Sequence, residues 1–524
     1  MTMRMQFYKI VCSCMLAVMF AACYEDKGNY SYSEKPEITA TGFPELVSVI
    51  QNAETLELTP SFTSSVEGNI DENPNFEFGC VLWKNAGVMS TGKRQLDINE
   101  EHTKNVSFFT TVDEGDYTAW YTVTDKRTGV VTNFPVPVKV TSATYEGWMV
   151  LADDKDGYAN MDLISLLSGG RKIIVRNVLG ADAPQLKGGN NIYLDPWPRY
   201  AKGDMIWYCT QEGSYSINPT KLTAMNNVVE SEFIEEPYEA DEQIVAMDGL
   251  YMSENFAVSN KGNLYVKISW KSGTMFENPI NTFTPDGKPE FRVAPFVGVS
   301  YNHPLSNGEY QALFYDKDNR QFVKWNENAD NSCCQLLEDP ANKLFSFKTG
   351  MDMVAMKNTK FSGGVVYSIL QDGTGQRHVY GINLSGGSFD QTYCKAITAP
   401  GFNAATQFAF HSQYPYMFYN NDNKVYAYQL MSDAVQNPLT LENEEITMLK
   451  FNIFMRATSE LSDQSDAFLE QQYYLMVGSY KKNVTDGTGG VLRFYKFSQA
   501  TGELTLVNEY TGFGRIKDVV YRER

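Results

Sequence analysis

Six aromatic and polar residues with the chemistry to hold a ligand lie in loop-like segments of the second half of the chain. They are Trp197, Arg199, Tyr200, Tyr251, His303 and Tyr414. The faces of Trp and Tyr stack on sugar rings or on apolar peptide side chains, and Arg and His supply hydrogen-bond donors for polar groups. We therefore predict these residues as contacts for a glycan or a peptide that is captured reversibly.

The sequence contains none of the common hydrolase motifs. His-Glu-x-x-His and Gly-x-Ser-x-Gly do not occur, and neither does the Ser-x-Asp-x-Gly-x-x-Trp box of sialidase-like propellers. Acidic residues are abundant, but Asp is common in turns, so abundance does not identify a catalytic carboxylate pair. We predict no catalytic residue and no enzyme activity, with a glycoside hydrolase or lyase as the enzyme alternative.

No metal site and no cofactor are predicted. The segment from Gly87 to Lys93 imitates a phosphate loop, but Arg94 follows where Ser or Thr is required. Asp154 and Asp156 lack the further ligands of a calcium loop. The 4 His residues are not spaced as a zinc pair, and no Cys-x-x-Cys occurs.

Charge excludes one class of partner. The chain has 524 residues with 44 Lys and Arg against 63 Asp and Glu, a net charge of −19. Such a field repels phosphate backbones, so we expect no nucleic-acid partner. The hydrophobic share of 43% is that of a globular protein large enough for several domains.

The N-terminal residues are predicted to be a targeting segment. Residues 1–22 carry two cations and no acid, and their apolar stretch is too short to span a bilayer, as in a secretory signal. Cys23 follows Ala21 and Ala22, as in a bacterial lipobox, whose Cys receives a diacylglycerol. We predict that residues 1–22 are removed, that Cys23 is lipidated, that residues 23–35 form a flexible linker, and that only the lipid contacts the membrane.

Residues 36–144 are predicted to fold as a β-sandwich of the Ig or PKD-like type with about seven strands. Short runs of alternating apolar residues are separated there by Gly, Asn and Asp turns. Trp83 is expected in the core, like the Trp of strand C in Ig domains. The run from Gly115 to Asp125 resembles the Gly-x-Tyr-x-x-x-x-x-Val-x-Asp strand of PKD domains.

Residues 145–524 are predicted to form a seven-bladed β-propeller, so the whole protein is expected to be all-β. Turn centres flanked by β-branched and aromatic residues recur at intervals that suit propeller blades with variable loops. They are Gly157, Gly213, Gly262, Asn319, Gly373, Asp422 and Gly487.

The innermost strand of each blade is predicted from short runs with small residues. Such runs are residues 245–248, 297–300, 354–357 and 408–411. The first hairpin has no such run before it, and residues 516–521 are expected to supply the missing strand and close the ring. The loops that leave these inner strands share one rim, which carries the six predicted ligand contacts.

Three features together resemble the PKD-like family of Bacteroidota lipoproteins. They are the segment from Cys23 to Tyr30, the PKD-like strand, and the segment from Glu146 to Leu151. The resemblance extends over essentially the whole mature chain and transfers no catalytic residue. It implies a lipid-anchored, surface-exposed protein of the outer membrane that assists a Sus-type transporter and its lipoprotein lid. A docking subunit of that transporter, without a small ligand, is a further alternative.

Overall fold

The structure is a computed structural model that describes residues 36–167, 171–195, 205–250, 254–268, 275–285, 287–300, 311–326, 332–384, 388–454 and 469–522. The chain forms two compact units, and the division between them falls between Val140 and Thr141. The sequence placed this division a few residues later, between residues 144 and 145. Each unit is described separately below.

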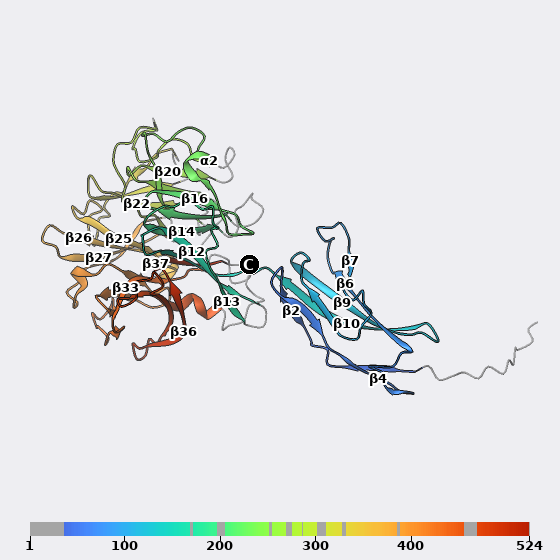
Figure 1. Cartoon of the computed structure of the whole chain (residues 1–524). Helices are drawn as coiled ribbons and strands as arrows, with labels where there is room; N and C mark the ends of the chain where they lie inside the picture. Colours follow the sequence, from blue (N-terminus) through green and yellow to red (C-terminus); the bar gives the residue numbers. More distant parts are fainter. Residues whose placement is uncertain are drawn as a thin grey trace, which may run out of the picture. The chain divides into compact units, whose positions relative to one another are not determined.

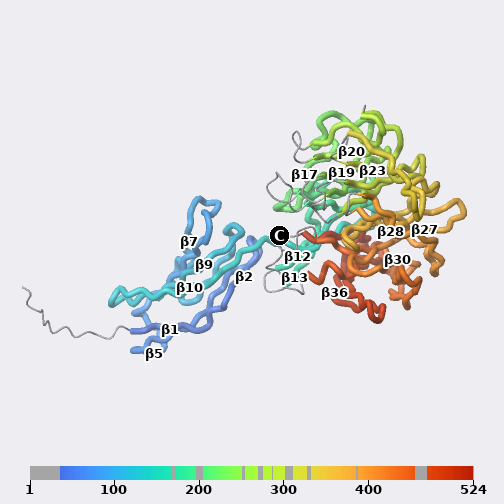
Figure 2. The backbone as a smooth tube through the Cα atoms, turned by 180° about the vertical axis from the view of Figure 1, so that it is seen from behind, coloured from blue at the N-terminus to red at the C-terminus, as the bar shows by residue number. Residues whose placement is uncertain are grey.

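The first unit is a β-sandwich (Figures 1 and 2). A five-stranded sheet has the order β2-β10-β9-β6-β7, a three-stranded sheet has the order β1-β4-β5, and β3 pairs with β8. The strands are β1 (Ile38–Thr41), β2 (Val47–Ile50), β3 (Thr55–Leu58), β4 (Ser61–Ser64), β5 (Gly68–Asn69), β6 (Phe76–Lys84), β7 (Gln95–Asp97), β8 (Val106–Phe109), β9 (Gly115–Asp125) and β10 (Val130–Thr141). The described residues thus contain more strands than the about seven that the sequence predicted, around one hydrophobic core.

The predicted PKD-like strand is β9, the central strand of the larger sheet. Its residues alternate between the core and the outer face, and Tyr117, Tyr121 and Val123 are buried. The hydroxyl of Tyr117 donates a hydrogen bond of 2.7 Å to the carbonyl oxygen of Asp113, four residues upstream. A Tyr that bonds back to nearby backbone in this way is typical of Ig-like sandwiches.

Trp83 does not lie in the core, so this expectation was wrong. In β6 the side chains of Phe76, Phe78, Cys80 and Leu82 are buried, and the two-residue period of the strand turns Trp83 outward. Trp83 is 37% exposed, and the guanidinium of Arg94 lies 5.5 Å from its ring centre.

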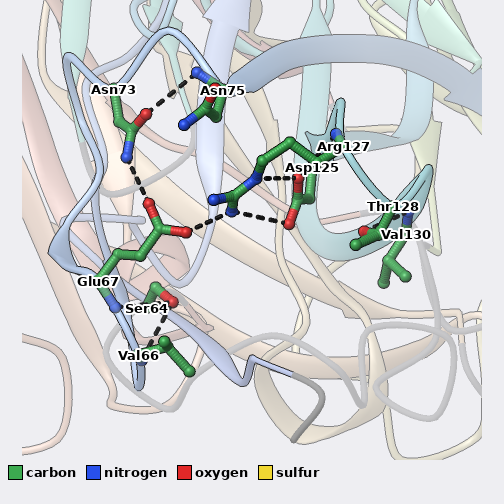
Figure 3. Close-up of polar contacts among 9 residues, drawn as sticks. All are labelled: Ser64, Val66, Glu67, Asn73, Asn75, Asp125, Arg127, Thr128 and Val130. Atoms are coloured by element: carbon green, nitrogen blue, oxygen red, sulfur yellow. Dashed lines mark hydrogen bonds and ion pairs between the residues drawn. The ribbon is translucent and has the colours of Figure 1, made fainter. Parts of the chain in front are cut away.

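The last residue of the PKD-like motif, Asp125, holds a turn and a loop together (Figure 3). Its side chain accepts hydrogen bonds of 2.9 Å and 3.0 Å from the backbone N–H and the Nε of Arg127. Arg127 also binds Glu67, whose other oxygen accepts a bond of 2.7 Å from Asn73. Arg127 holds the pKa of Asp125 below its usual value, mainly through these hydrogen bonds.

Replacement of Asp125 with Asn is expected to destabilise the sandwich. The variant keeps the size of the side chain but loses the charge that strengthens the bonds from Arg127, a loss of about 1–2 kcal/mol. The free energy of unfolding from urea denaturation of the full chain measures it. Glu67→Gln is the matched control and is expected to lose less, because Glu67 is more exposed. Equal stability of Asp125→Asn and the wild-type protein would contradict this role.

The second unit consists of seven antiparallel sheets within the described residues. Each of the seven turn centres predicted from the sequence lies at a turn that joins two paired strands. In sheet order the strands are β13 (Lys172–Val175), β12 (Ala159–Leu166), β11 (Gly147–Asp153) and β37 (Arg515–Arg522) in sheet 1, β14 (Gly189–Asp195), β15 (Met205–Thr210), β16 (Gly213–Ile217) and β17 (Ala224–Asn227) in sheet 2, β18 (Ile244–Gly249), β19 (Glu254–Ser259) and β20 (Leu264–Ile268) in sheet 3, and β21 (Gly298–Val299), β22 (Gln311–Asp316), β23 (Gln321–Asn326) and β24 (Gln335–Leu336) in sheet 4.

The remaining three sheets have the same plan. They are β25 (Asp352–Asn358), β26 (Val365–Gln371), β27 (Arg377–Asn383) and β28 (Asp390–Ala396) in sheet 5, β29 (Phe408–Phe410), β30 (Tyr416–Asn421), β31 (Lys424–Gln429) and β32 (Leu439–Thr440) in sheet 6, and β33 (Glu444–Phe451), β34 (Tyr474–Lys481), β35 (Gly490–Phe497) and β36 (Leu504–Phe513) in sheet 7. Helices in the described residues are single turns: α2 (Val228–Ser231), η2 (Phe361–Gly363), η3 (Phe402–Ala404) and η4 (Glu470–Tyr473).

Each sheet packs against the next through a hydrophobic cluster. Clusters of buried residues join sheets 1 and 2, 2 and 3, 3 and 4, 4 and 5, 5 and 6, and 6 and 7. A further cluster joins sheet 7 back to sheet 1, with Trp148 against Phe494 and Tyr521 at ring-centre distances of 4.8 Å. The sheets therefore follow one another in a cycle, as the succession of colours in Figure 1 also shows, and this is the arrangement of a β-propeller.

The two ends of the second unit meet in sheet 1. β37 pairs with β11 from Gly147 opposite Arg522 to Asp153 opposite Arg515, and it is the strand expected at residues 516–521. Gly147 has a φ of +146°, and a Cβ there would lie 2.1 Å from the carbonyl oxygen of Ile164, so this position requires glycine. Arg522 is fully buried and donates hydrogen bonds to the backbone carbonyls of Thr144 and Pro219.

A chain that ends at residue 514 is expected to lose the cooperative unfolding of the second unit. It lacks β37, which uncovers the edge of β11 and removes buried Ile516, Val519 and Tyr521 from the cluster between sheets 7 and 1. A thermal melt followed by circular dichroism measures the loss. A chain that ends at Arg522 is the control and should melt like the full chain. A shorter chain with an unchanged melting temperature would show that β37 is dispensable.

Candidate functional site

A cavity of about 440 Å³ lies where the innermost strands of the seven sheets converge. Its walls come from β14, β18, β25, β29, β33 and β37, and from residues 295–297, which lead into β21. We call it the central cavity. Its volume lies within the range of small-molecule sites in proteins.

Small residues let the inner strands approach one another. At Gly298 in β21 a Cβ would lie 3.0 Å from both Leu313 and the sulfur of Met356, so even an added methyl group would crowd two neighbours. Ala246 and Ala409 line the cavity on two other sheets. The runs of small residues that predicted these inner strands therefore reflect crowding around the cavity.

Amide side chains connect neighbouring inner strands. Asn191 on β14 donates a hydrogen bond of 2.7 Å to the carbonyl oxygen of Met247 on β18. Asn358 on β25 donates to the carbonyl oxygen of Val297 at 2.9 Å and accepts from the N–H of Val299 at 3.0 Å. These bonds satisfy strand-edge groups that would otherwise face the cavity unpaired.

Two further side chains connect sheet 1 to its two neighbours, sheet 2 and sheet 7. Asp518 on β37 accepts a hydrogen bond of 2.9 Å from the N–H of Ile192 on β14. Asn452, which directly follows β33, accepts one of 3.1 Å from the N–H of Tyr521 on β37. The polar lining is thus held in place by the backbone of adjacent sheets.

Three lysines and two aspartates line the central cavity in the described part of the chain. Lys450 lies 2.6 Å from Asp518, and Lys517 lies 3.1 Å from Asp153, which is buried next to the lining. Lys357 forms no hydrogen bond or ion pair with any described residue. Desolvation by burial lowers the pKa of Lys357, and the charge of Lys450 lowers it further.

Both carboxylates of this lining are engaged within the protein. Asp518 accepts bonds from Lys450 and from the N–H groups of Ile192 and Val519. Asp248 accepts a bond of 2.8 Å from the N–H of Gly249, and the amide of Asn358 lies 3.3 Å from its other oxygen. This arrangement holds and orients a ligand more readily than it supplies a free acid and base pair.

Most of the ligand contacts predicted from the sequence lie outside the described residues. These are Trp197, Arg199, Tyr200, Tyr251 and His303, together with the predicted lipidation site Cys23. Tyr414 is described and does not line the central cavity. It packs against the cluster between sheets 6 and 7, with its ring centre 4.8 Å from that of His411. Its role as a ligand contact stays a prediction.

The charged residues of the central cavity were not predicted from the sequence, although the sequence carries a signal for them. Lys357, Lys450 and Lys517 stand inside or at the end of apolar inner-strand runs. A charge in such a run is costly unless it is paired or reaches a polar cavity. An unexplained Lys in an inner strand is thus the pattern that points to this site.

His411 is buried among aromatic rings beside the wall of the cavity. Its Nδ1 accepts a hydrogen bond of 3.0 Å from the N–H of Gln413, and its ring packs against Tyr414, Phe451 and Phe497. Desolvation by burial lowers the pKa of His411 to about 4 from 6.5. The neutral imidazole with its proton on Nε2 is therefore the folded form at neutral pH.

Acidification should destabilise the second unit through His411. Between pH 6.5 and pH 4 the unfolded chain takes up a proton at this residue that the folded chain excludes, so stability falls as the pH falls. The contribution is at most about 3 kcal/mol. Urea denaturation at several pH values should give a shallower pH dependence for His411→Gln than for the wild-type protein. Equal slopes for the two proteins would refute the contribution.

Groups of three or more His, Cys, Asp or Glu side chains that could hold a metal ion are absent from the described residues. The five cysteines that the structure describes, Cys80, Cys209, Cys333, Cys334 and Cys394, form no disulfide. In the described ranges no helix has the length and apolar character needed to cross a membrane.

Comparison with known families gives one match, and it includes the sandwich and the start of sheet 1. Residues 23–190 match the PKD-like family. The match contains the PKD-like strand β9 and the segment from Glu146 to Leu151, which carried the resemblance in the sequence. It ends at residue 190, whereas the resemblance was expected to extend over the whole mature chain. No curated protein sequence matches the chain.

Several solved structures resemble the chain at low identity. A quinonprotein alcohol dehydrogenase-like protein from Bacteroides thetaiotaomicron is 11% identical, with a TM-score of 0.44 over 94% of this chain and 100% of that one. A putative 6-phosphogluconolactonase from Bacteroides fragilis is 14% identical, with a TM-score of 0.41 over 73% and 99%. The β-propeller domain of Swd1 from Myceliophteria thermophila is 10% identical, with a TM-score of 0.35 over 69% and 97%. No activity is transferred from these likenesses.

Proposed function

We propose that this protein reversibly binds a small ligand in the central cavity. The observation that carries the proposal is the cavity itself, of about 440 Å³, which is lined by apolar side chains and by polar groups that hydrogen bonds hold in place. Sites of this volume and composition are typical of ligand-binding proteins. The proposal makes the seven sheets the blades of one propeller, closed by β37, with the ligand on its axis.

Binding rather than catalysis is favoured by the state of the polar groups. The cavity carboxylates Asp248 and Asp518 each accept hydrogen bonds from the protein, and Lys450 and Lys517 each have an acidic partner. Groups held in this way provide a fixed surface for recognition. A glycosidase would instead require one carboxylic acid and one free carboxylate that face each other across the ligand.

We propose the cell surface as the setting of this binding. The lipobox-like sequence at Cys23 supports lipid anchoring, and the match of residues 23–190 to the PKD-like family supports the resemblance from which the setting was inferred. In this proposal the protein is held at the outer membrane, captures a glycan or a peptide, and assists a Sus-type transporter and its lipoprotein lid. Trp197, Arg199, Tyr200, Tyr251, His303 and Tyr414 remain predicted ligand contacts.

A ligand screen by thermal shift tests the proposal. The chain from residue 24 onward contains every described residue and lacks the lipid acceptor. Because a ligand that binds only the folded state raises the melting temperature by mass action, a binding oligosaccharide or short peptide should raise it. A ligand at 100 times its Kd stabilises by about 2.7 kcal/mol, which is readily measured.

Asn190→Trp is the variant that links such a hit to the central cavity. Asn190 is an exposed residue of the lining, so a Trp there should obstruct the cavity and abolish the shift. Lys155→Trp, at an exposed turn outside the lining, is the matched control and should keep the shift. If both variants keep it, the ligand binds elsewhere and the proposal is wrong.

A further inference from the structure

Lys357 is the one lysine of the cavity lining that lacks a partner among the described residues. It lies on β25 next to Asn358, whose amide is bound to Val297. The other two lysines of the lining, Lys450 and Lys517, are paired with Asp518 and Asp153. An ammonium group without a partner is costly in such an enclosed place, so its retention requires a reason.

Asp518, the carboxylate whose charge acts on Lys357, already accepts three hydrogen bonds within the protein. One oxygen of Asp518 accepts from Lys450 at 2.6 Å and from the N–H of Val519 at 2.9 Å. Its other oxygen accepts from the N–H of Ile192 at 2.9 Å. Lys357 and Lys450 are close enough for the charge of one to lower the pKa of the other, and Asp518 compensates only in part. Lys357 is therefore the ammonium of the lining whose charge no ion pair within the described residues offsets.

A second unpartnered donor lies on the same wall as Lys450. Asn452 is 4% exposed and follows β33 by one residue. Its Oδ1 accepts the hydrogen bond from the N–H of Tyr521, and its Nδ2 has no hydrogen-bond partner among the residues that the structure describes. A buried donor left unpaired costs free energy, and an acceptor brought by a ligand would relieve that cost.

Large apolar side chains form another part of the lining. Met356, Phe408, Phe410, Met448 and Phe451 line this cavity from sheets 5, 6 and 7, beside polar residues that include Asp248. The apolar side chains offer contact area to a carbon skeleton. The cavity therefore combines an ammonium group that has no partner among the described residues with a lining that is part apolar and part polar.

We propose that the ligand of the central cavity is an anion, whose carboxylate or phosphate group pairs with the ammonium of Lys357. This inference rests on the proposed function, because it names the chemical class that the same cavity accepts. Lys450 adds a second positive charge while it stays bound to Asp518, and the amide of Asn452, on the same wall as Lys450, is the additional donor. The carbon skeleton of the ligand lies against the apolar side chains.

Ligand pairs that differ in charge test the inference. Thermal shifts of the chain from residue 24 onward are measured with hexanoate against hexanamide, glucuronate against glucose, and glucose 6-phosphate against glucose. The inference expects the anion of at least one pair to raise the melting temperature while its neutral partner has no effect. The first two pairs report on a carboxylate and the third on a phosphate, so they distinguish the two sources of charge.

Lys357→Met identifies the residue that binds the anion. The variant should weaken binding of the anion by about tenfold or more, as expected from loss of a charged hydrogen-bond partner. Lys357→Arg keeps the charge and should retain binding. The Lys357→Met protein should also melt at a higher temperature than the wild-type protein without ligand, because an unpaired enclosed charge has been removed.

Lys517→Met is the matched control for stability in the same cavity. Lys517 has a partner, and its removal leaves Asp153 unpaired at 7% exposure, so this variant should melt at a lower temperature. A structural Lys357 would behave in the same way as Lys517. A lower melting temperature for Lys357→Met would therefore overturn the inference even if no ligand were found.

The results of these experiments distinguish a failure of this inference from a failure of the proposed function. If neutral members of the pairs bind as well as the anions, or if Lys357→Met keeps the anion shift, the cavity binds ligands but the anion inference is wrong. If an anion binds and Asn190→Trp also keeps the shift, the site lies elsewhere and both are wrong. An anion shift that is lost in Lys357→Met and in Asn190→Trp supports both.

Discussion

The second unit depends on the pairing of its two ends. β11 and β37 stand at opposite ends of this part of the sequence, yet they are neighbours in one sheet. Without this pairing, sheet 1 has an open edge, the cluster between sheets 7 and 1 is incomplete, and the central cavity loses the wall that carries Asp518. The hydrogen bonds of buried Arg522 to Thr144 and Pro219 fix the same junction. The shape of the cavity is thus set by contacts between residues that are far apart in sequence.

The polar groups of the cavity have two different roles. Asn191, Asn358 and Asp518 bind the backbone of adjacent strands, so they position the sheets. The backbone of Lys357 belongs to β25, but its ammonium forms no hydrogen bond or ion pair with the described residues. The distinction is energetic: a residue that satisfies its neighbours stabilises the folded state, whereas an unsatisfied charge is retained at a cost in stability.

Much of the fold could be predicted from the sequence because turns and strands leave local signals. Gly and Asn or Asp turn centres located every middle hairpin of the second unit, and the small residues of the inner strands located the cavity walls. The errors arose where burial depends on which face of a strand a residue occupies. Trp83 follows Val81 and Leu82, so this run is apolar on both faces of the strand, and only the pairing of β6 places Leu82 inside. Lys357, Lys450 and Asp518 come from three different sheets, and no local pattern shows that they converge.

The position of β37 also governs when the protein can fold. β37 follows every other strand of the second unit in the sequence, so sheet 1 cannot be completed before the other six sheets have been synthesised. Closure then has to bring together segments separated by nearly the whole second unit, and contacts of such high sequence separation form slowly. Until that closure, the edge of β11 has no partner strand, so the slowest contact of the unit is also the one that protects its exposed edge.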